Sequence, residues 1–490
     1  MDKLETLRQY FGYTFFRPGQ ETLIDAQLAG RDAFGIMPTG GGKSLCYQIP
    51  ALMLPGVTLV VCPLISLMRD QVMALKAAGV AGAYINSSLT PGQIRLVYRN
   101  IMAGMYKIIY VAPERLLTEG FLEAIQTRKV SLLTVDEAHC ISQWGQDFRP
   151  SYLKIVDFLN LLPERPVVSA FTATATARVR QDVEEILGLQ DPTRVVTGFD
   201  RPNLRFEVRS PKDKGEALLG LLREREQDSG IVYCSTRKEV ENVCAMLKAQ
   251  GFAATRYHAG LEEQERQENQ EDFLYDRATV MVATNAFGMG IDKSNVSFVI
   301  HYNMPQSLES YYQEAGRAGR DGEDAQCILL YAPRDIHVAE YLIQNPSRES
   351  ELTPEQQEQR IRKDLERLAY MKQYCRTKTC LRGTILGYFG ETHPARCGNC
   401  SNCDPKKEKR ATVQSAAGKE LLAELKALRW DLAKKGGVPA YIIFTDASLE
   451  DMARKQPRNM EEFLRVTGVG KTKAQRYGQS FLAAIARHHS

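Results

Sequence analysis

The chain of 490 residues is long enough for about three domains. Apolar residues make up 44% and charged residues 25% of it, as in ordinary globular proteins, and the net charge of +4 is too small to indicate a partner. No apolar run reaches the length of about 18 residues that a membrane span needs, which argues against a membrane partner. The opening MDKLETLRQYFGY lacks the apolar core of a signal peptide, so we expect a cytoplasmic protein.

Two successive stretches share one pattern of short apolar runs separated by helical segments. From about residue 30 to 200 the runs include TLVVCPL and SLLTVDEA, and from about 201 to 335 they include GIVYCST and VSFVIHYNM. Apolar runs with helical spacers are typical of parallel α/β sheets, so the sequence predicts two adjacent α/β domains.

From about residue 345 the alternating apolar runs stop, and the rest of the chain is predicted to be mainly helical. Thr353 and Pro354 fit the N-cap and first position of a helix, and residues 404–419 are rich in charged and small residues, as linkers are. The predicted units are 1–200 and 201–338 for the α/β domains, 339–405 for a helical cysteine-containing unit, 406–417 for a linker and 418–490 for a small helical bundle.

The segment MPTGGGKS lies between the apolar AFGI and LCYQIP, the order of strand, glycine loop and helix in a phosphate-binding loop. Glycines let backbone N–H groups converge on phosphate oxygens, and Lys43 would reach the β- and γ-phosphates of ATP. The general pattern has glycine where Met37 stands. The alternative is a glycine turn with a solvated lysine. The candidate ATP-binding residues of this loop are Met37, Pro38, Thr39, Gly40, Gly41, Gly42, Lys43 and Ser44.

The segment TVDEAH resembles the acidic end of a buried strand. Beside a phosphate loop, Asp136 would join Ser44 in binding Mg²⁺, and Glu137 would act as general base. His139 closes the motif and is counted among the catalytic candidates. Taken alone, the same letters fit a solvated turn.

The segment SYYQEAGRAGRDG lies in the second half of the chain. Arg317 and Arg320 are three positions apart, on one face if the segment is helical. An arginine supplied from a facing domain stabilises the transferring phosphoryl group, and Gln313 is a further catalytic candidate. The alternative is a solvated arginine face.

Eleven cysteines in a reducing compartment need an explanation other than disulfides. Four of them, Cys380, Cys397, Cys400 and Cys403, are spaced as C-x₁₆-C-x₂-C-x₂-C, which favours a structural tetrahedral zinc site. A cysteine-rich surface turn and an iron–sulfur cluster are the alternatives. The other seven, Cys375 included, are expected to be small buried hydrophobic residues.

With these motifs, the chain resembles superfamily 2 helicases and specifically the RecQ family of DNA helicases. FRPGQ resembles the adenine-reading motif through Arg17 and Gln20, and SAFTATAT resembles the motif that couples hydrolysis between domains. The resemblance implies two RecA-like motor domains and a helical zinc-binding subdomain. It also implies ATP, Mg²⁺ and Zn²⁺ as cofactors and ATP-driven 3′ to 5′ movement along single-stranded DNA.

The stretch HCISQWGQDFRPSY after the acidic motif resembles the aromatic-rich loop of RecQ helicases. Aromatic rings stack on bases at about 1–3 kcal/mol per base without reading sequence. Trp144 and Phe148 would contact DNA, Arg149 would pair with phosphate or a stacked base, and the loop would report bound DNA to Glu137. The alternative is that the two aromatic rings pack between the domains.

Residues 438–485 resemble the HRDC domain, a small all-α bundle that binds nucleic acid in RecQ proteins. A glycine turn in TGVGKTKAQRYG precedes Lys471, Lys473 and Arg476 and suits phosphate contact, whereas a plain helix connection with solvated charges is the alternative. Tyr441 fits either base stacking or burial. Many RecQ proteins carry a winged-helix domain after the zinc unit, but residues 404–418 are too few for one. We therefore expect weaker unwinding of blunt or structured duplexes.

The resemblance implies a DNA helicase of repair and recombination that acts on single-stranded and forked DNA. A single-stranded DNA-binding protein and other recombination proteins are its expected partners, in the bacterial cytosol near the nucleoid. Two other functions stay open: an RNA helicase of the DEAH type, and a DNA-binding or annealing scaffold with a secondary ATPase.

Overall fold

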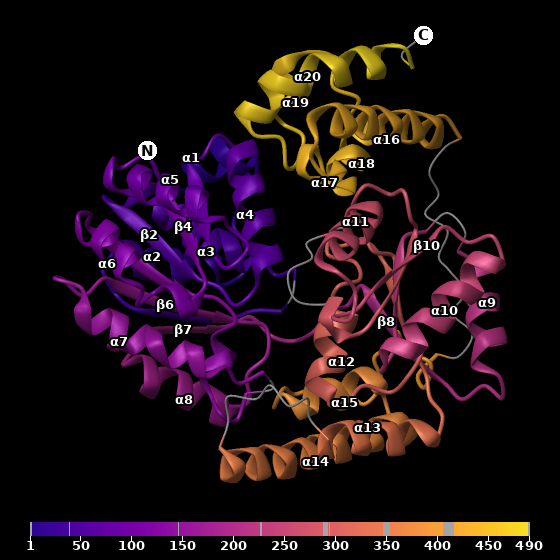
Figure 1. Cartoon of the computed structure of the whole chain (residues 1–490). Coiled ribbons are helices and arrows are strands. Elements are labelled where there is room, and N and C mark those ends of the chain that lie inside the picture. The colour runs from indigo at the N-terminus through magenta and orange to yellow at the C-terminus, as the bar shows by residue number, and fades with distance from the viewer. Residues whose placement is uncertain are drawn as a thin grey trace.

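The computed structural model describes residues 2–38, 40–145, 147–225, 228–287, 293, 295–345, 353–404 and 416–488. Two α/β domains lie side by side, and two helical parts lie at opposite ends of them (Figure 1). The bundle α16–α20 sits at one end, and the long helix α14 runs along the other. None of the described helices has the length and apolar character needed to cross a membrane.

The first domain is built on a seven-stranded parallel sheet in the order β3-β4-β2-β5-β6-β1-β7. Its strands are short and mostly buried, as expected for a sheet covered by helices on both faces. The strands are β1 Ala33–Ile36, β2 Val57–Val61, β3 Gly82–Ile85, β4 Ile108–Val111, β5 Val130–Val135, β6 Val167–Thr172 and β7 Thr193–Val196. The helices are α1 Lys3–Thr6, η1 Leu7–Phe11, α2 Gln20–Leu28, α3 Lys43–Met53, α4 Ile65–Ala77, α5 Pro91–Met102, η2 Pro113–Arg115, α6 Glu119–Gln126, η3 Ala138–Ile141, η4 Pro150–Leu153, α7 Lys154–Leu161 and α8 Ala177–Leu187.

The second domain has a six-stranded parallel sheet in the order β10-β11-β9-β12-β13-β8. The strands are β8 Leu204–Arg209, β9 Gly230–Tyr233, β10 Ala254–Tyr257, β11 Val280–Ala283, β12 Phe298–His301 and β13 Ala325–Leu330. The helices are α9 Lys214–Arg223, α10 Arg237–Ala249, α11 Glu263–Leu274, η5 Asn285–Phe287, α12 Leu308–Ala315 and α13 Arg334–Gln344. The predicted pair of parallel α/β domains is confirmed.

The cysteine-containing unit begins with α14 Pro354–Arg376 and α15 Leu381–Tyr388. The predicted start of α14 is confirmed, because the Gln356 N–H donates to Thr353 Oγ1 at 3.3 Å and the Thr353 N–H donates to the Gln356 side chain. The unit packs on the beginning of the second domain. Phe389 stacks on Phe199 with ring centroids 4.3 Å apart, and an isolated parallel bridge joins Cys400 to Phe206 of β8.

The C-terminal bundle comprises α16 Ala416–Gly436, α17 Ala440–Ile443, α18 Asp446–Lys455, α19 Met460–Phe463 and α20 Lys471–Ala486. Its own apolar core includes Phe444 and Phe481, whose rings meet edge to face with centroids 5.0 Å apart. Helix α16 begins two residues before the predicted bundle boundary, and the rest of the predicted linker lies outside the described residues.

The bundle touches both α/β domains. Gly468 N–H donates to the Gly12 carbonyl at 3.1 Å, and Gly12 has φ +75° and no room for a Cβ beside Val469. On the second domain, the Trp430 indole N–H donates to the Tyr275 carbonyl at 3.0 Å. The bundle therefore bridges the two domains on the side away from α14 (Figure 1).

Candidate nucleotide and nucleic-acid site

The phosphate loop connects β1 to α3, as the sequence predicts. Gly40 and Gly42 have φ of +80° and +81°, which glycine adopts at little cost, and Gly42 is the N-cap of α3. Lys43 starts the helix, and its Nζ lies 3.5 Å from the Met37 carbonyl oxygen. The helix N-terminus and the left-handed glycines give the loop an anion-binding character. Thr39 lies outside the described residues.

Arg17 and Gln20 hold the phosphate loop from outside. Gln20 is buried, its Nε2 donates to the Gly42 carbonyl at 3.0 Å, and its Oε1 accepts from the Arg17 N–H at 2.8 Å. The Arg17 guanidinium donates to the Gly40 carbonyl. Both side chains thus bond to the loop backbone, and their contact with an adenine base stays a prediction.

The two carboxylates follow β5 at the same edge of the sheet. Only β6 lies between β5 and β1, and Asp136 is near enough to the phosphate loop for the charge of Lys43 to act on its carboxyl group. Glu137 has φ +47°, an uncommon conformation for a residue with a side chain and one found at functional sites. Burial, reinforced by the charge of Glu137, raises the pKa of Asp136 to about 7.

His139 joins the acidic motif to the next strand. Its Nδ1 lies 3.3 Å from Glu137 Oε2 and 2.9 Å from the Oγ1 of Thr172, at the end of β6. Burial lowers the pKa of His139, against the opposing charge of Glu137. His139 therefore links the carboxylate of Glu137 to the end of β6 through one side chain.

The second domain brings its arginine segment to the phosphate loop. A Cβ built on Gly40 would lie 3.4 Å from Cγ of Arg320, so the arginine stem packs on the loop. Gln313 donates from Nε2 to Thr174 Oγ1 at 3.4 Å across the domain boundary. Arg317 is buried beside the Tyr233 phenol. Both arginines lie in turns after α12 has ended, so they do not form the helical face considered from their spacing.

The aromatic loop lies between the acidic motif and α14. Trp144 is 42% exposed, and Lys363 of α14 places its Nζ 3.5 Å from the centroid of the indole ring. Arg149 pairs with Asp147 at 2.8 Å and donates to the Pro63 carbonyl at 3.1 Å. Trp144 thus contacts the cysteine-containing unit and remains partly exposed, and Arg149 is already engaged within the first domain.

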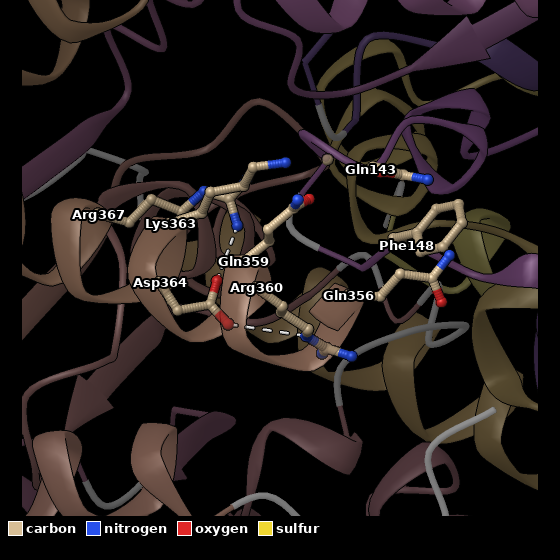
Figure 2. Close-up of a pocket in the computed structure, with 9 residues that line it drawn as sticks. Gln143, Phe148, Gln356, Gln359, Arg360, Lys363, Asp364 and Arg367 are labelled. Carbon is tan, nitrogen blue, oxygen red and sulfur yellow. Dashed lines mark hydrogen bonds and ion pairs between the residues drawn. The ribbon is translucent and has the colours of Figure 1, made fainter. Parts of the chain in front are cut away.

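An open pocket is lined by residues of this loop on one side and of α14 on the other. Figure 2 shows the side chains of Gln359, Lys363 and Arg367 on the helix, with Phe148 and Gln143 on the loop side. The lining residues are Gln143, Gly145, Phe148, Gln356, Gln359, Arg360, Lys363, Asp364 and Arg367. Phe148 was predicted from its aromatic-rich segment, whereas the residues of α14 were not predicted. Their spacing of three and four along one stretch was the available signal.

The four predicted zinc ligands come together. The sulfur atoms of Cys380, Cys397, Cys400 and Cys403 lie within 4.8 Å of one another, and sulfurs around a tetrahedral zinc ion are about 3.8 Å apart. Cys380 caps α15, where the Gly383 N–H donates to its Sγ at 3.3 Å. Cys375 is buried outside this set, as expected. The donor set fits a closed, structural zinc site.

Comparisons with known proteins follow the same division of the chain. Family models match as DEAD/DEAH box helicase over residues 17–183, helicase conserved C-terminal domain over 213–322, RecQ zinc-binding over 333–404 and HRDC domain over 418–485. The chain is 38% identical to the ATP-dependent DNA helicase RecQ of Bacillus subtilis, covering 98% of this chain and 97% of that one. The RecQ protein of Pasteurella multocida is 36% identical, with 99% and 94% covered. The chain belongs to the RecQ family.

Solved structures similar to this RecQ-family chain support its fold. Saccharomyces cerevisiae Dbp5 bound to RNA and ADP BeF3 matches with a TM-score of 0.55 at 18% identity, covering 72% of this chain and 94% of that one. The DUF1998 helicase MrfA bound to DNA matches at 0.54 and 19%, covering 75% and 52%. The two parallel-sheet domains are thus arranged as in helicase motors, and we call them the first and second motor domains.

The RecQ-family comparison also bears on the winged-helix domain. The zinc-binding match ends at residue 404 and the HRDC match begins at residue 418. The residues between them are too few for a further domain. The alignment with the Bacillus subtilis protein covers 584 positions, more than the 490 residues of this chain. That relative therefore contains residues that have no counterpart here.

Proposed function

We propose that this protein is an ATP-dependent DNA helicase that couples ATP hydrolysis to 3′ to 5′ movement on single-stranded DNA. The observation that carries the proposal is the meeting of both motor domains at one loop. Lys43 and the two carboxylates come from the first domain, and Arg320 of the second domain packs on Gly40. Hydrolysis that needs groups from both domains can drive their relative movement.

Each residue of the site has a proposed role. Lys43 neutralises charge on the β- and γ-phosphates, Glu137 accepts a proton from the attacking water, and Arg317 and Arg320 stabilise the transferring phosphoryl group. Arg17 and Gln20 keep their predicted role at the adenine base.

Two metal sites complete the proposal. Ser44 and Asp136 supply the oxygen ligands that Mg²⁺ prefers, and the ion would screen phosphate charge when bound. The four cysteines supply thiolates for Zn²⁺, which would fix the fold of the unit around them.

The Lys43→Ala variant tests the motor. A helicase should lose DNA-stimulated ATP hydrolysis and unwinding while retaining its affinity for single-stranded DNA. If the variant lost ATP hydrolysis but kept a function in DNA binding or strand annealing, the result would instead favour a scaffold or annealing protein. Comparing ATPase stimulation by single-stranded DNA and by RNA of the same sequence distinguishes a DNA helicase from an RNA helicase.

We further propose that forked and single-stranded DNA are its substrates in repair and recombination, in the bacterial cytosol. A single-stranded DNA-binding protein is a proposed partner, because a helicase exposes the strands that such a protein covers. Without a winged-helix domain, unwinding of blunt duplexes should be weaker than that of tailed forks. An unwinding assay on duplexes with 3′ and with 5′ tails measures the direction of movement and this deficit together.

A further inference from the structure

The loop that carries Trp144 is held by one face of α14. The Arg367 guanidinium donates to the Trp144 carbonyl oxygen. Lys363, one turn earlier on the same face, lies over the indole ring. Helix α14 therefore contacts both the backbone and the ring of this loop, and a displacement of Trp144 changes the surroundings of Arg367.

Arg367 also reaches the second motor domain. Its Nε lies 3.7 Å from Oε1 of Glu309, in the first turn of α12, while its Nη1 bonds to Asp364 at 2.9 Å. The Tyr388 hydroxyl donates to the same Glu309 oxygen at 2.5 Å. The side chains of Arg367 and Glu309 are only 14% and 9% exposed, so their attraction is less screened than that of a surface ion pair.

Helix α12 connects Glu309 to the residues proposed for hydrolysis. Gln313, one turn after Glu309, bonds to Thr174 of the first domain, and the two arginines follow the end of the helix. One small open pocket is also lined by Trp144, Glu309, Thr174 and His139. The aromatic loop, the acidic motif and α12 thus meet around one space.

We propose that Arg367 and Glu309 are positioning residues that transmit the state of the Trp144 loop to α12 and so to Arg317 and Arg320. The inference rests on the proposed helicase function and adds to it a route through the zinc-binding subdomain. When bound DNA displaces Trp144, the ion pair between Arg367 and Glu309 changes its geometry. Helix α12 then shifts as a unit and changes how the arginines face the phosphate loop.

The test compares ATP hydrolysis with and without single-stranded DNA in the full chain. Glu309→Gln keeps an acceptor for Tyr388 and removes the charge that faces Arg367, and Arg367→Ala removes the other partner. Each should lower the DNA-stimulated rate about tenfold, equivalent to about 1.4 kcal/mol of coupling, and leave the DNA-free rate and the KM for ATP within about twofold. Arg362→Ala on the exposed side of α14, where Arg362 pairs with Glu358, is the matched control and should change neither rate.

A double variant distinguishes coupling from packing. If the two residues act through one contact, Arg367→Ala together with Glu309→Gln should lose no more stimulation than either alone, and Arg367→Lys should recover part of it. Full stimulation in both single variants would overturn the inference. So would a lower melting temperature with equal loss of the DNA-free and stimulated rates. Persistence of stimulated hydrolysis in Lys43→Ala would overturn the proposed function itself, which is a different outcome.

Discussion

The two helical parts that flank the motor are attached to it in different ways. The zinc-binding subdomain inserts Arg382 into the start of the second motor domain, where the guanidinium bonds to the carbonyls of Arg201 at 2.7 Å and Pro202 at 3.3 Å. The side chain of Arg382 is only 6% exposed. The HRDC bundle instead has its own apolar core and meets the motor through contacts such as Trp430 to Tyr275 and Thr472 Oγ1 to the Ala78 carbonyl at 3.3 Å.

This difference indicates different functions for the two parts. An element whose buried cation bonds to motor backbone carbonyls breaks these buried hydrogen bonds when it leaves, so we expect the zinc-binding subdomain to move with the second motor domain. A bundle with its own core and peripheral polar contacts can detach and stay folded. The first part is suited to transmitting movement, and the second to regulated docking.

Removing the zinc site should have the largest effect. Cys400→Ser loses a thiolate ligand and alters the residue that bridges to β8, so it should unfold the zinc-binding subdomain and destabilise the second motor domain by several kcal/mol. Thermal unfolding of the full chain, with zinc content measured in parallel, tests this. Cys375→Ser, which changes a buried cysteine outside the cluster, is the control and should retain zinc. An unchanged melting temperature after loss of zinc would show that the subdomain is not integral to the motor.

Arg382→Ala should have the next largest effect. It leaves the carbonyls of Arg201 and Pro202 without this donor, and we expect a loss of about 3 kcal/mol in the free energy of unfolding, measured by urea titration. Arg362→Ala, which removes an exposed arginine of α14, should change it by less than about 0.5 kcal/mol. If both substitutions lowered the free energy of unfolding equally, Arg382 would not anchor the zinc-binding subdomain more firmly than a surface contact does.

Trp144→Ala examines a contact between α14 and the first motor domain. It should reduce DNA stimulation of ATP hydrolysis by the loss of about 1–3 kcal/mol of stacking, with a nearly unchanged melting temperature. Steady-state ATPase titrated with single-stranded DNA, beside thermal unfolding, measures both. A lower melting temperature with normal stimulation would show that Trp144 serves packing between the domains.

The smallest effect is expected at the docked HRDC bundle. Burial and the facing carboxylate of Glu323 raise the pKa of Glu450 of α18 from 4.5 to about 7, with Lys426 opposing the shift and Asp446 adding to it. Because the docked carboxyl binds its proton more tightly than the free one, docking should be strongest below pH 4.5 and weaken as the pH rises to about 7. The protection of the amides around Tyr275, measured relative to their intrinsic exchange rate at each pH, should therefore fall as the pH rises.

Glu450→Gln should remove this pH dependence and dock more firmly at about pH 8. Glu461→Gln is a suitable control, because Glu461 is an exposed carboxylate that pairs with Arg465 of the same bundle. A pH dependence that survives in Glu450→Gln would assign it to another group.

The sequence predicted the elements whose signals are local. Three motifs could be recognised from a few neighbouring residues: the glycine loop after one strand, the pair of carboxylates after another, and the four closely spaced cysteines. The fold brings the residues of each motif together as expected. The N-cap Thr353, followed by Pro354, is a signal of the same kind. Parallel-strand topology then explains why Asp136 lies near Lys43.

Apart from the arginine expected at the phosphate loop, the contacts between domains could not be predicted, because they join residues far apart in the chain. Nothing around Arg382 distinguishes it from a surface arginine until the start of the second motor domain packs over it. The spacing of Arg317 and Arg320 suggested a helical face, yet α12 ends before them. Arg17 and Gln20 were assigned to a base, and only the fold revealed that they also bond to the phosphate loop.

The backbone bridge between Cys400 and Phe206 bears on how readily the protein aggregates. β8 is the last strand of the second sheet, and an uncovered last strand invites pairing with another chain. The zinc loop covers part of that border, so a molecule synthesised under zinc shortage would expose a template for aggregation besides losing activity. Light scattering of the chelated protein at increasing concentration would reveal this second liability.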